Sequence, residues 1–178
     1  MPCACGSRKF PSLLFSARDA DGDPGVWGPP LWAILHRIAG RVGNGENPVI
    51  DKDHAWHAEF LVNGLSTVLP CETCQTHCRA YLKAHPFSCG SLAGPALKEY
   101  VRDWLVQFHN AVRASKGQPL EVRDVGSLAA LYEGPIPECD MNALMAHVAY
   151  GVRTRLVKAD NWKRWSAVLK RFKLMLGL

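Results

Sequence analysis

The sequence is organised around the stretch Leu69-Pro70-Cys71-Glu72-Thr73-Cys74-Gln75-Thr76-His77-Cys78. Pro70 ends the element before it, and residues 71–84 can then form a helix. The start of a helix offers free backbone N–H groups and the positive end of the helix dipole. Both favour a thiolate over a thiol. The spacing of Cys71 and Cys74 at this helix start therefore predicts a reactive dithiol.

Three interpretations of these cysteines are open from the residues alone. The first is a pair, Cys71 and Cys74, that cycles between dithiol and disulfide. The second is a structural zinc site, in which the pair is joined by ligands drawn from His77, Cys78 and Cys89. The third is a set of inert core cysteines, which is disfavoured because a Cys-x-x-Cys pair at a helix start suits reactivity. The sequence lacks the second Cys-x-x-Cys pair that structural zinc sites usually have.

Composition excludes several classes of protein. Of the 178 residues, 48% are hydrophobic, which indicates a globular chain with a real core. The net charge of +5 is a mild excess that we interpret as a solvated face, so we expect no nucleic-acid partner. No apolar run is long enough to span a membrane, and no secretory signal is visible, which predicts a cytoplasmic protein. The seven cysteines then indicate catalytic or metal-binding use.

Apolar residues recur at helical spacing, and no segment alternates as a strand does. Four helices are expected in the first part of the chain, with Pro29 and Pro30 in the first turn of the first one. They cover residues 27–39, 51–68, 71–84 and 95–116. Asp51 or Asp53 is the expected cap of the second helix, and Ser91 is a possible cap for the fourth. Trp56 is expected among the apolar positions of the second helix.

Further helices are expected beyond the fourth one. A short helix is possible within residues 121–132, and longer ones are expected over 141–157 and 161–176, the last with Asp160 as its cap. The last helix is basic and amphipathic. Its apolar side is expected to pack on its own domain or on a partner subunit. The predicted class is therefore all-α.

Three further motifs give the cysteine pair a context. They are Trp32-x-x-Leu35-His36, His85-Pro86, and Trp104-x-x-x-x-His109-Asn110-x-Val112-Arg113 followed by Gly117-Gln118-Pro119. With Pro70-Cys71-x-x-Cys74, their order and spacing resemble the Erv/ALR family of FAD-dependent sulfhydryl oxidases. The resemblance runs from about Trp27 to Pro119. Four motifs in order, each on an expected helix, are far more specific than any one alone.

The resemblance implies a four-helix bundle that binds FAD at one end, with the C-terminal helices as additions. It implies that Cys71 exchanges with substrate thiols and that Cys74 lies nearest the flavin, so that electrons pass through the flavin to oxygen and form hydrogen peroxide. It also implies a set of cofactor-binding residues, which are Gly28, Trp32, His36, His109, Asn110, Arg113 and Lys116. No metal site is implied, and the alternative is a zinc-stabilised helical interaction module.

The sequence departs from the family pattern at several positions. Leu69 replaces an aromatic residue, Arg113 replaces an asparagine, and Gln118 replaces a lysine. Arg113 or Lys116 is a candidate for the cation that meets the FAD phosphates. The cysteines of a family disulfide, expected near residues 106 and 123, are both absent. Cys78, Cys89 and Cys139 therefore have no inherited role, and their pairing is open.

The chain divides into three predicted regions. Residues 1–24 form a flexible tail in which Cys3 and Cys5 are a possible electron shuttle, residues 25–119 form the oxidase-like domain, and residues 120–178 form a helical extension. The extension is expected on the core or at a subunit interface. The resemblance implies a homodimer that acts on thiol-containing proteins, and the divergent core fits a member from a large DNA virus. That origin would make virion proteins the substrates, and infected-cell cytoplasm or the virion the location.

Overall fold

The computed structural model describes residues 22–45, 47–120 and 131–178. These ranges are helical and contain no strand, which confirms the all-α class for the described part of the chain. The elements are α1 (Pro24–Arg41), α2 (Pro48–Gly64), the short 3-10 helix η1 (Leu65–Thr67), α3 (Glu72–Ala84), α4 (Gly94–Ser115), α6 (Glu138–Arg153) and α7 (Ala159–Met175). Among these described helices, none has the length and apolar character needed to cross a membrane.

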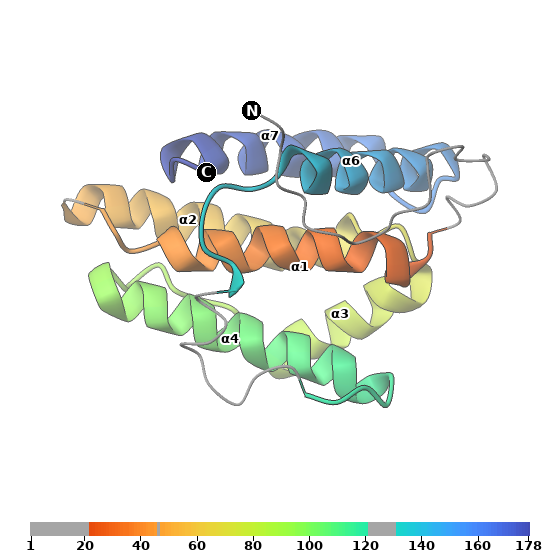
Figure 1. The fold of residues 1–178 in the computed structure, drawn as a ribbon, viewed down its shortest axis with the longest axis horizontal. Helices are drawn as coiled ribbons and strands as arrows, with labels where there is room; N and C mark the ends of the chain where they lie inside the picture. Colours follow the sequence, from red (N-terminus) through yellow and green to blue (C-terminus); the bar gives the residue numbers. More distant parts are fainter. Residues whose placement is uncertain (1–21, 46, 121–130) are drawn as a thin grey trace.

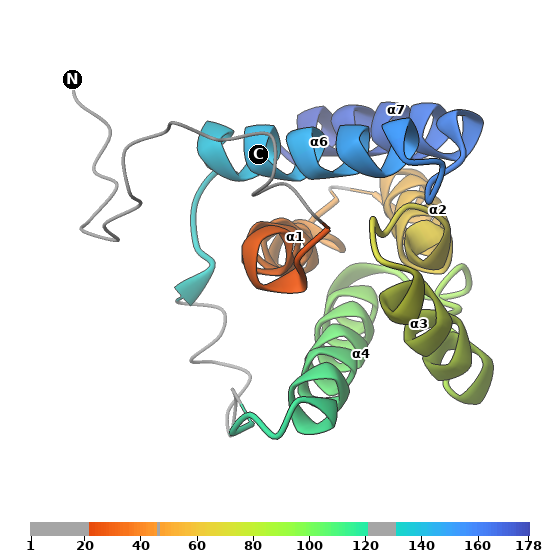
Figure 2. The same cartoon turned by 90° about the vertical axis from the view of Figure 1, so that its right-hand side faces the viewer.

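The helices form layers around α1 and α2. Helices α3 and α4 lie on one side of this central pair, and α6 and α7 lie on the other (Figures 1 and 2). Helix α6 packs against α1, and α7 packs against α2. The C-terminal helices contribute to the same buried apolar cluster as the first four, since Trp165, Leu169 and Phe172 are almost fully buried within it.

Helix α1 begins earlier than the sequence predicts. Asp23 is its cap, with the carboxylate accepting a hydrogen bond from the backbone N–H of Gly25 at 2.7 Å. Pro24 follows at the first helical position, where a missing N–H is harmless. Pro29 and Pro30 therefore lie inside the helix, and their predicted placement in its first turn is wrong. The strong cap at Asp23 explains the earlier start.

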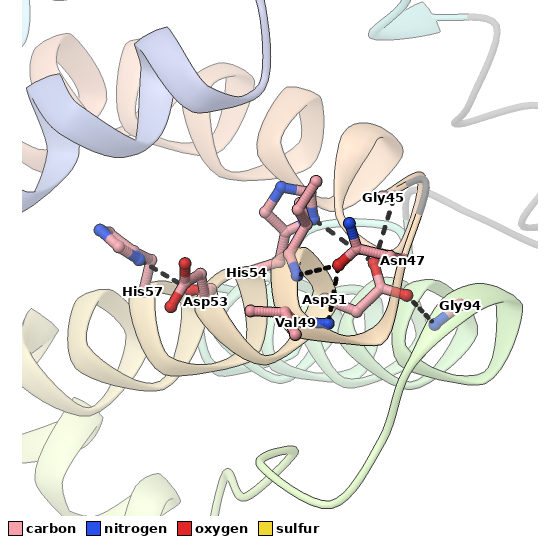
Figure 3. Close-up of polar contacts among 9 residues, drawn as sticks. Gly45, Asn47, Val49, Asp51, Asp53, His54, His57 and Gly94 are labelled. Atoms are coloured by element: carbon pink, nitrogen blue, oxygen red, sulfur yellow. Dashed lines mark hydrogen bonds and ion pairs between the residues drawn. The ribbon is translucent and has the colours of Figure 1, made fainter.

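Helix α2 also begins earlier than predicted. Its cap is Asn47, whose side-chain oxygen accepts hydrogen bonds from the N–H groups of Val49 and Ile50 (Figure 3). Asp51 and Asp53 lie within the helix, so neither is the cap. The prediction that Trp56 is a core position is also wrong, because its side chain is 53% exposed. Helix α2 is buried on two sides, against α4 and against α7, which leaves Trp56 on the remaining, solvent-facing side.

The ends of the later helices depart from prediction by a few residues. Ala93 precedes α4, and neither Ser91 nor Asp160 acts as a side-chain cap. Gly117 ends α4 with a positive φ of 64°, as its position predicts. Helix α6 starts at Glu138 and ends at Arg153, earlier at both ends than expected. The possible helix over 121–132 falls almost wholly outside the described residues.

Candidate functional site

The cysteine pair at the start of α3 forms a disulfide. Cys71 and Cys74 are bonded, with their Cα atoms 5.2 Å apart. Cys71 is the capping residue of α3, and its Sγ accepts a hydrogen bond from the backbone N–H of Cys74 at 3.2 Å. Both side chains are partly exposed. The sulfur of Cys71 therefore sits where the helix N–H groups and dipole stabilise a thiolate once the bond is reduced.

A cluster of aromatic and imidazole rings joins α1 to α4. Trp32 stacks on His109 with ring centroids 4.1 Å apart and an interplanar angle of 10°. His36 Nε2 and His109 Nδ1 lie 3.1 Å apart and share a hydrogen bond. Both imidazoles are buried. The three predicted residues Trp32, His36 and His109, which are separated by up to 77 positions along the chain, are thus brought together in one site.

Burial keeps these imidazoles neutral. Desolvation lowers the pKa of His36 to about 4. It also lowers the pKa of His109 to about 3, with smaller contributions from His36 and from the positive charges of Arg113 and Lys116. Both rings are therefore uncharged at neutral pH. Flat, neutral ring faces such as these suit the binding of a planar aromatic group.

The cationic candidates lie at the end of α4. Arg113 Nε donates a hydrogen bond to the carbonyl oxygen of Pro119 at 2.7 Å, which holds the turn after the helix. Lys116 is exposed at the end of α4, and Asn110 is half-buried beside His109. Two cations next to a neutral ring cluster match the chemistry of a flavin nucleotide, which joins a planar ring system to a negatively charged diphosphate.

Gly28 adds to this fit. It is buried in α1, yet among the described residues no atom lies within 4 Å of the position that a Cβ would take. The glycine thus leaves space next to the backbone of α1, one turn before Trp32. The residues present are therefore suited to holding FAD, with ring-binding groups on α1 and α4 and cations at the end of α4.

Tyr132 also belongs to the ring cluster, although no sequence motif predicts it. Its ring stacks on His36 at 4.9 Å with an interplanar angle of 18°, and the Arg37 guanidinium lies 5.7 Å from its centroid. Tyr132 comes from the segment after α4, where no predicted motif lies. A lone tyrosine in a weakly periodic region gives no signal in the sequence, because its contact with His36 exists only in the folded chain.

Aromatic contacts connect α3 with the ring cluster. Tyr81 of α3 lies against Phe108 of α4, with ring centroids 4.7 Å apart. Phe108 in turn meets the edge of Trp32 at 5.3 Å. The start of α1, the start of α3 and the end of α4 also lie at the same end of the molecule (Figure 1). Helix α3, which begins at the disulfide, is therefore joined to the ring cluster by aromatic contacts near its other end.

The remaining cysteines of the described ranges are not paired with one another. Cys78 and Cys89 are buried free thiols, and burial raises the pKa of each to about 12. Cys89 donates a weak hydrogen bond to the carbonyl oxygen of Ala55. Cys139 is exposed. Cys78 and Cys89 therefore have the character of inert core thiols.

The described residues provide no group of side chains for the structural zinc site that is the alternative interpretation. Within residues 22–45, 47–120 and 131–178, no three cysteine, histidine or acidic side chains are grouped so that they could hold a metal ion. The other predicted thiols, Cys3 and Cys5, lie outside the described residues.

Comparisons with known proteins agree on one family. The sequence model of the Erv1/Alr family matches residues 29–127, more than half of the chain. A candidate FAD-linked sulfhydryl oxidase of Invertebrate iridescent virus 6 is 30% identical over 101 residues, which cover 56% of this chain and 87% of the viral protein. The FAD-linked sulfhydryl oxidase ERV1 of Oryza sativa subsp. japonica is 32% identical over 93 residues, 52% of this chain and 43% of the rice protein. No solved structure matches the chain.

Proposed function

Because the chain belongs to the Erv1/Alr family, we propose that it is an FAD-linked sulfhydryl oxidase that makes disulfides in protein substrates. The observation that carries the proposal is the Cys71–Cys74 disulfide at the start of α3, inside the region that matches the family. Both of the relatives described above are named for this activity.

The cysteines perform the thiol chemistry in two exchanges. A substrate thiolate attacks Sγ of Cys71, which forms a mixed disulfide and releases Cys74 as a thiolate. A second substrate thiolate then attacks the substrate sulfur, so the substrate leaves as a disulfide and Cys71 leaves as a thiolate. The N–H of Cys74, which lies 3.2 Å from Sγ of Cys71, stabilises that leaving thiolate. The protein pair is now a dithiol.

The ring cluster and the cations would hold the cofactor. Trp32, His36 and His109 would contact the flavin ring system, with Gly28 leaving room for it, while Arg113 and Lys116 would meet the phosphates and Asn110 would lie along the nucleotide. Bound FAD would take two electrons from the dithiol and give them to oxygen, which forms hydrogen peroxide. Cys74 would be the cysteine nearest the flavin, and Cys71 would face the substrate.

The proposal also covers the substrates, the oligomeric form and the location of the protein. Thiol-containing proteins, virion proteins among them, would be the substrates, and a homodimer in the cytoplasm of an infected cell or in the virion would be the working form. The viral relative supports this assignment. The relay by Cys3 and Cys5 and the division of the chain at residues 24 and 119 stay predictions.

One variant tests the activity directly. The purified protein should be yellow, with the absorbance of a flavin, and should take up oxygen when dithiothreitol is added. Cys74→Ala should abolish this uptake because it removes the electron donor, whereas Cys139→Ala, at an exposed cysteine outside the pair, should retain it. A colourless protein that contains one zinc ion per chain, or full oxygen uptake by Cys74→Ala, would contradict the proposal.

A further inference from the structure

The turn between α6 and α7 lies against the segment that leads into the cysteine pair. Gly151, near the end of α6, packs on Pro70 so closely that an added Cβ would come within 2.9 Å of the proline Cβ. The same Cβ would be equally close to Val157, which lies in the turn. Only a glycine lets α6 approach Pro70 in this way. The contact is therefore built into the sequence of α6.

A single side chain ties the turn to the first turn of α3. The Nε2 atom of Gln75 donates one hydrogen bond to the carbonyl oxygen of Leu69 at 2.8 Å and another to that of Leu156 at 2.9 Å. Leu69 precedes the cysteine pair, and Leu156 belongs to the α6–α7 turn. Both partners can only accept, and the amide of Gln75 has two N–H groups, one for each of them.

The backbone of Gln75 is also hydrogen-bonded within the helical turn that contains the disulfide. It directly follows Cys74, and its own N–H bonds to the carbonyl oxygen of Cys71 at 2.9 Å. Gln75 thus connects three segments. Its side chain bonds to Leu69, before the pair, and to Leu156, in the α6–α7 turn, while its backbone belongs to the helical turn that contains the pair. The family match ends at residue 127, so the α6–α7 turn lies beyond it.

We propose that the α6–α7 turn is a positioning device for the Cys71–Cys74 pair and that Gln75 is the positioning residue through which it acts. This inference rests on the proposed redox role of the pair. With Gln75 in place, the segment 69–71 stays ordered when the disulfide is reduced, so the two sulfurs remain close. Without it, the dithiol gains conformational freedom, and closing the disulfide becomes less favourable.

The expected effect is on the redox equilibrium of the pair. Loss of the two Gln75 hydrogen bonds should lower the equilibrium constant for disulfide formation about tenfold, which is about 30 mV in reduction potential. Gln75→Ala and Gln75→Met should both show this shift. The methionine nearly keeps the length of the side chain and adds no charge, but its thioether has no N–H to donate to the carbonyl oxygens. A role in packing alone would leave Gln75→Met close to the wild type.

The test equilibrates the 178-residue chain, with oxygen excluded, with a series of reduced and oxidised glutathione mixtures. Free thiols are then alkylated, and the peptide with Cys71 and Cys74 is weighed by mass spectrometry. Gln107→Ala is the matched control, because Gln107 is an exposed glutamine on α4, away from the pair. Gly151→Ala is a second variant that should shift the equilibrium in the same direction by pushing Pro70 away. Its control is Gly40→Ala, where an added Cβ meets no described atom within 4 Å.

The outcomes separate this inference from the proposed function. Suppose that the wild-type pair changes between dithiol and disulfide over the series, and that the equilibrium constants of both Gln75 variants agree with the wild-type value within about threefold, which is about 15 mV for a two-electron couple. The positioning role is then overturned, while the oxidase role stands. If the wild-type pair does not change state over the whole series, the oxidase role itself fails. A shift in the Gln75 and Gly151 variants, with both controls unchanged, supports the positioning role.

Discussion

The contact between Tyr132 and His36 shows how single residues complete the ring cluster. Two aromatic rings stack on the imidazole of His36. The ring centroid of Trp32 lies 5.9 Å from that of His36, and the centroid of Tyr132 lies 4.9 Å from it. The Nε2 atom of His36 also bonds to His109. The imidazole is thus fixed in orientation by three rings. The motif Trp32-x-x-Leu35-His36 predicts two members of this cluster. Tyr132 could not be predicted, because nothing in its local sequence marks it.

Removing the Tyr132 ring should weaken flavin binding. Loss of one stacking contact on His36 is worth up to about 1.5 kcal/mol, or about a tenfold increase in Kd. We expect Tyr132→Ala to show this increase and Tyr132→Phe, which keeps the ring, to remain near the wild type. The measurement is titration of flavin-free protein with FAD, followed by flavin fluorescence. Equal affinities of the alanine variant and the wild type would refute the role of Tyr132.

At the scale of elements, a buried carboxylate connects the starts of α2 and α4. Asp51 is only 4% exposed, and it accepts hydrogen bonds from the N–H groups of Gly94 at 2.7 Å and Gly45 at 3.1 Å (Figure 3). His54 Nδ1 lies 3.7 Å from the same carboxylate. Gly94 is the first residue of α4, so Asp51 supplies the missing cap of that helix from another element.

Asp51→Ala should therefore destabilise the fold. It leaves two backbone N–H groups without their acceptor in a buried place, which costs about 1–3 kcal/mol in the free energy of unfolding. Urea denaturation measures this change. Asp53→Ala is the matched control, because Asp53 is an exposed aspartate two positions along the same helix. If the two variants lose the same small amount of stability, the role of Asp51 as a distant cap is wrong.

The helices differ in how far the sequence could predict them. Helix α3 was predictable, because Pro70 and Cys71 give a local start signal and His85-Pro86 gives a local stop. The buried face of α2 was not, because α2 packs on two sides and buries Asp51, His54 and His57 along with apolar residues. A rule that assigns apolar residues to the core then misplaces Trp56. Helix starts that depend on a distant partner, such as Asp51 for α4, leave no local signal.

At the scale of the whole molecule, the C-terminal helices complete the core. Trp165 of α7 is buried, and its Nε1 donates a hydrogen bond to the carbonyl oxygen of Leu61 in α2 at 2.9 Å. Gly64 leaves room for the Trp165 ring, since an added Cβ would lie 3.0 Å from it. The amphipathic pattern of residues 161–176 predicts a packed helix, but only the folded chain identifies α2 as its neighbour.

Four buried histidines make stability dependent on pH. Desolvation lowers the pKa of each below its usual value, so all are neutral at neutral pH in the folded protein; they are His36, His54, His109 and His147. In the unfolded chain a histidine has a pKa of about 6.5. Below that pH the unfolded chain binds more protons, so the folded state loses stability as the pH falls from about 6.5 toward 4.

Urea denaturation at pH 7.5 and at pH 5.0 checks this prediction. The free energy of unfolding should be lower at pH 5.0, because His36 and His109, whose pKa values in the folded protein lie below 5, each contribute a loss of up to about 1.4 kcal/mol per pH unit. His36→Asn should lessen the difference, since it removes one titrating group. An unfolding free energy that is equal at both pH values would show that these imidazoles are protonated without cost.

The central claim is that electrons pass from the Cys71–Cys74 dithiol to a bound flavin. The most direct test is the visible absorbance of the purified protein when dithiothreitol is added without oxygen. The wild type should lose its flavin absorbance as the flavin is reduced, and Cys74→Ser should keep it, with the same amount of flavin bound. Bleaching of Cys74→Ser at the wild-type rate, or a wild type with no flavin absorbance to lose, would contradict the claim.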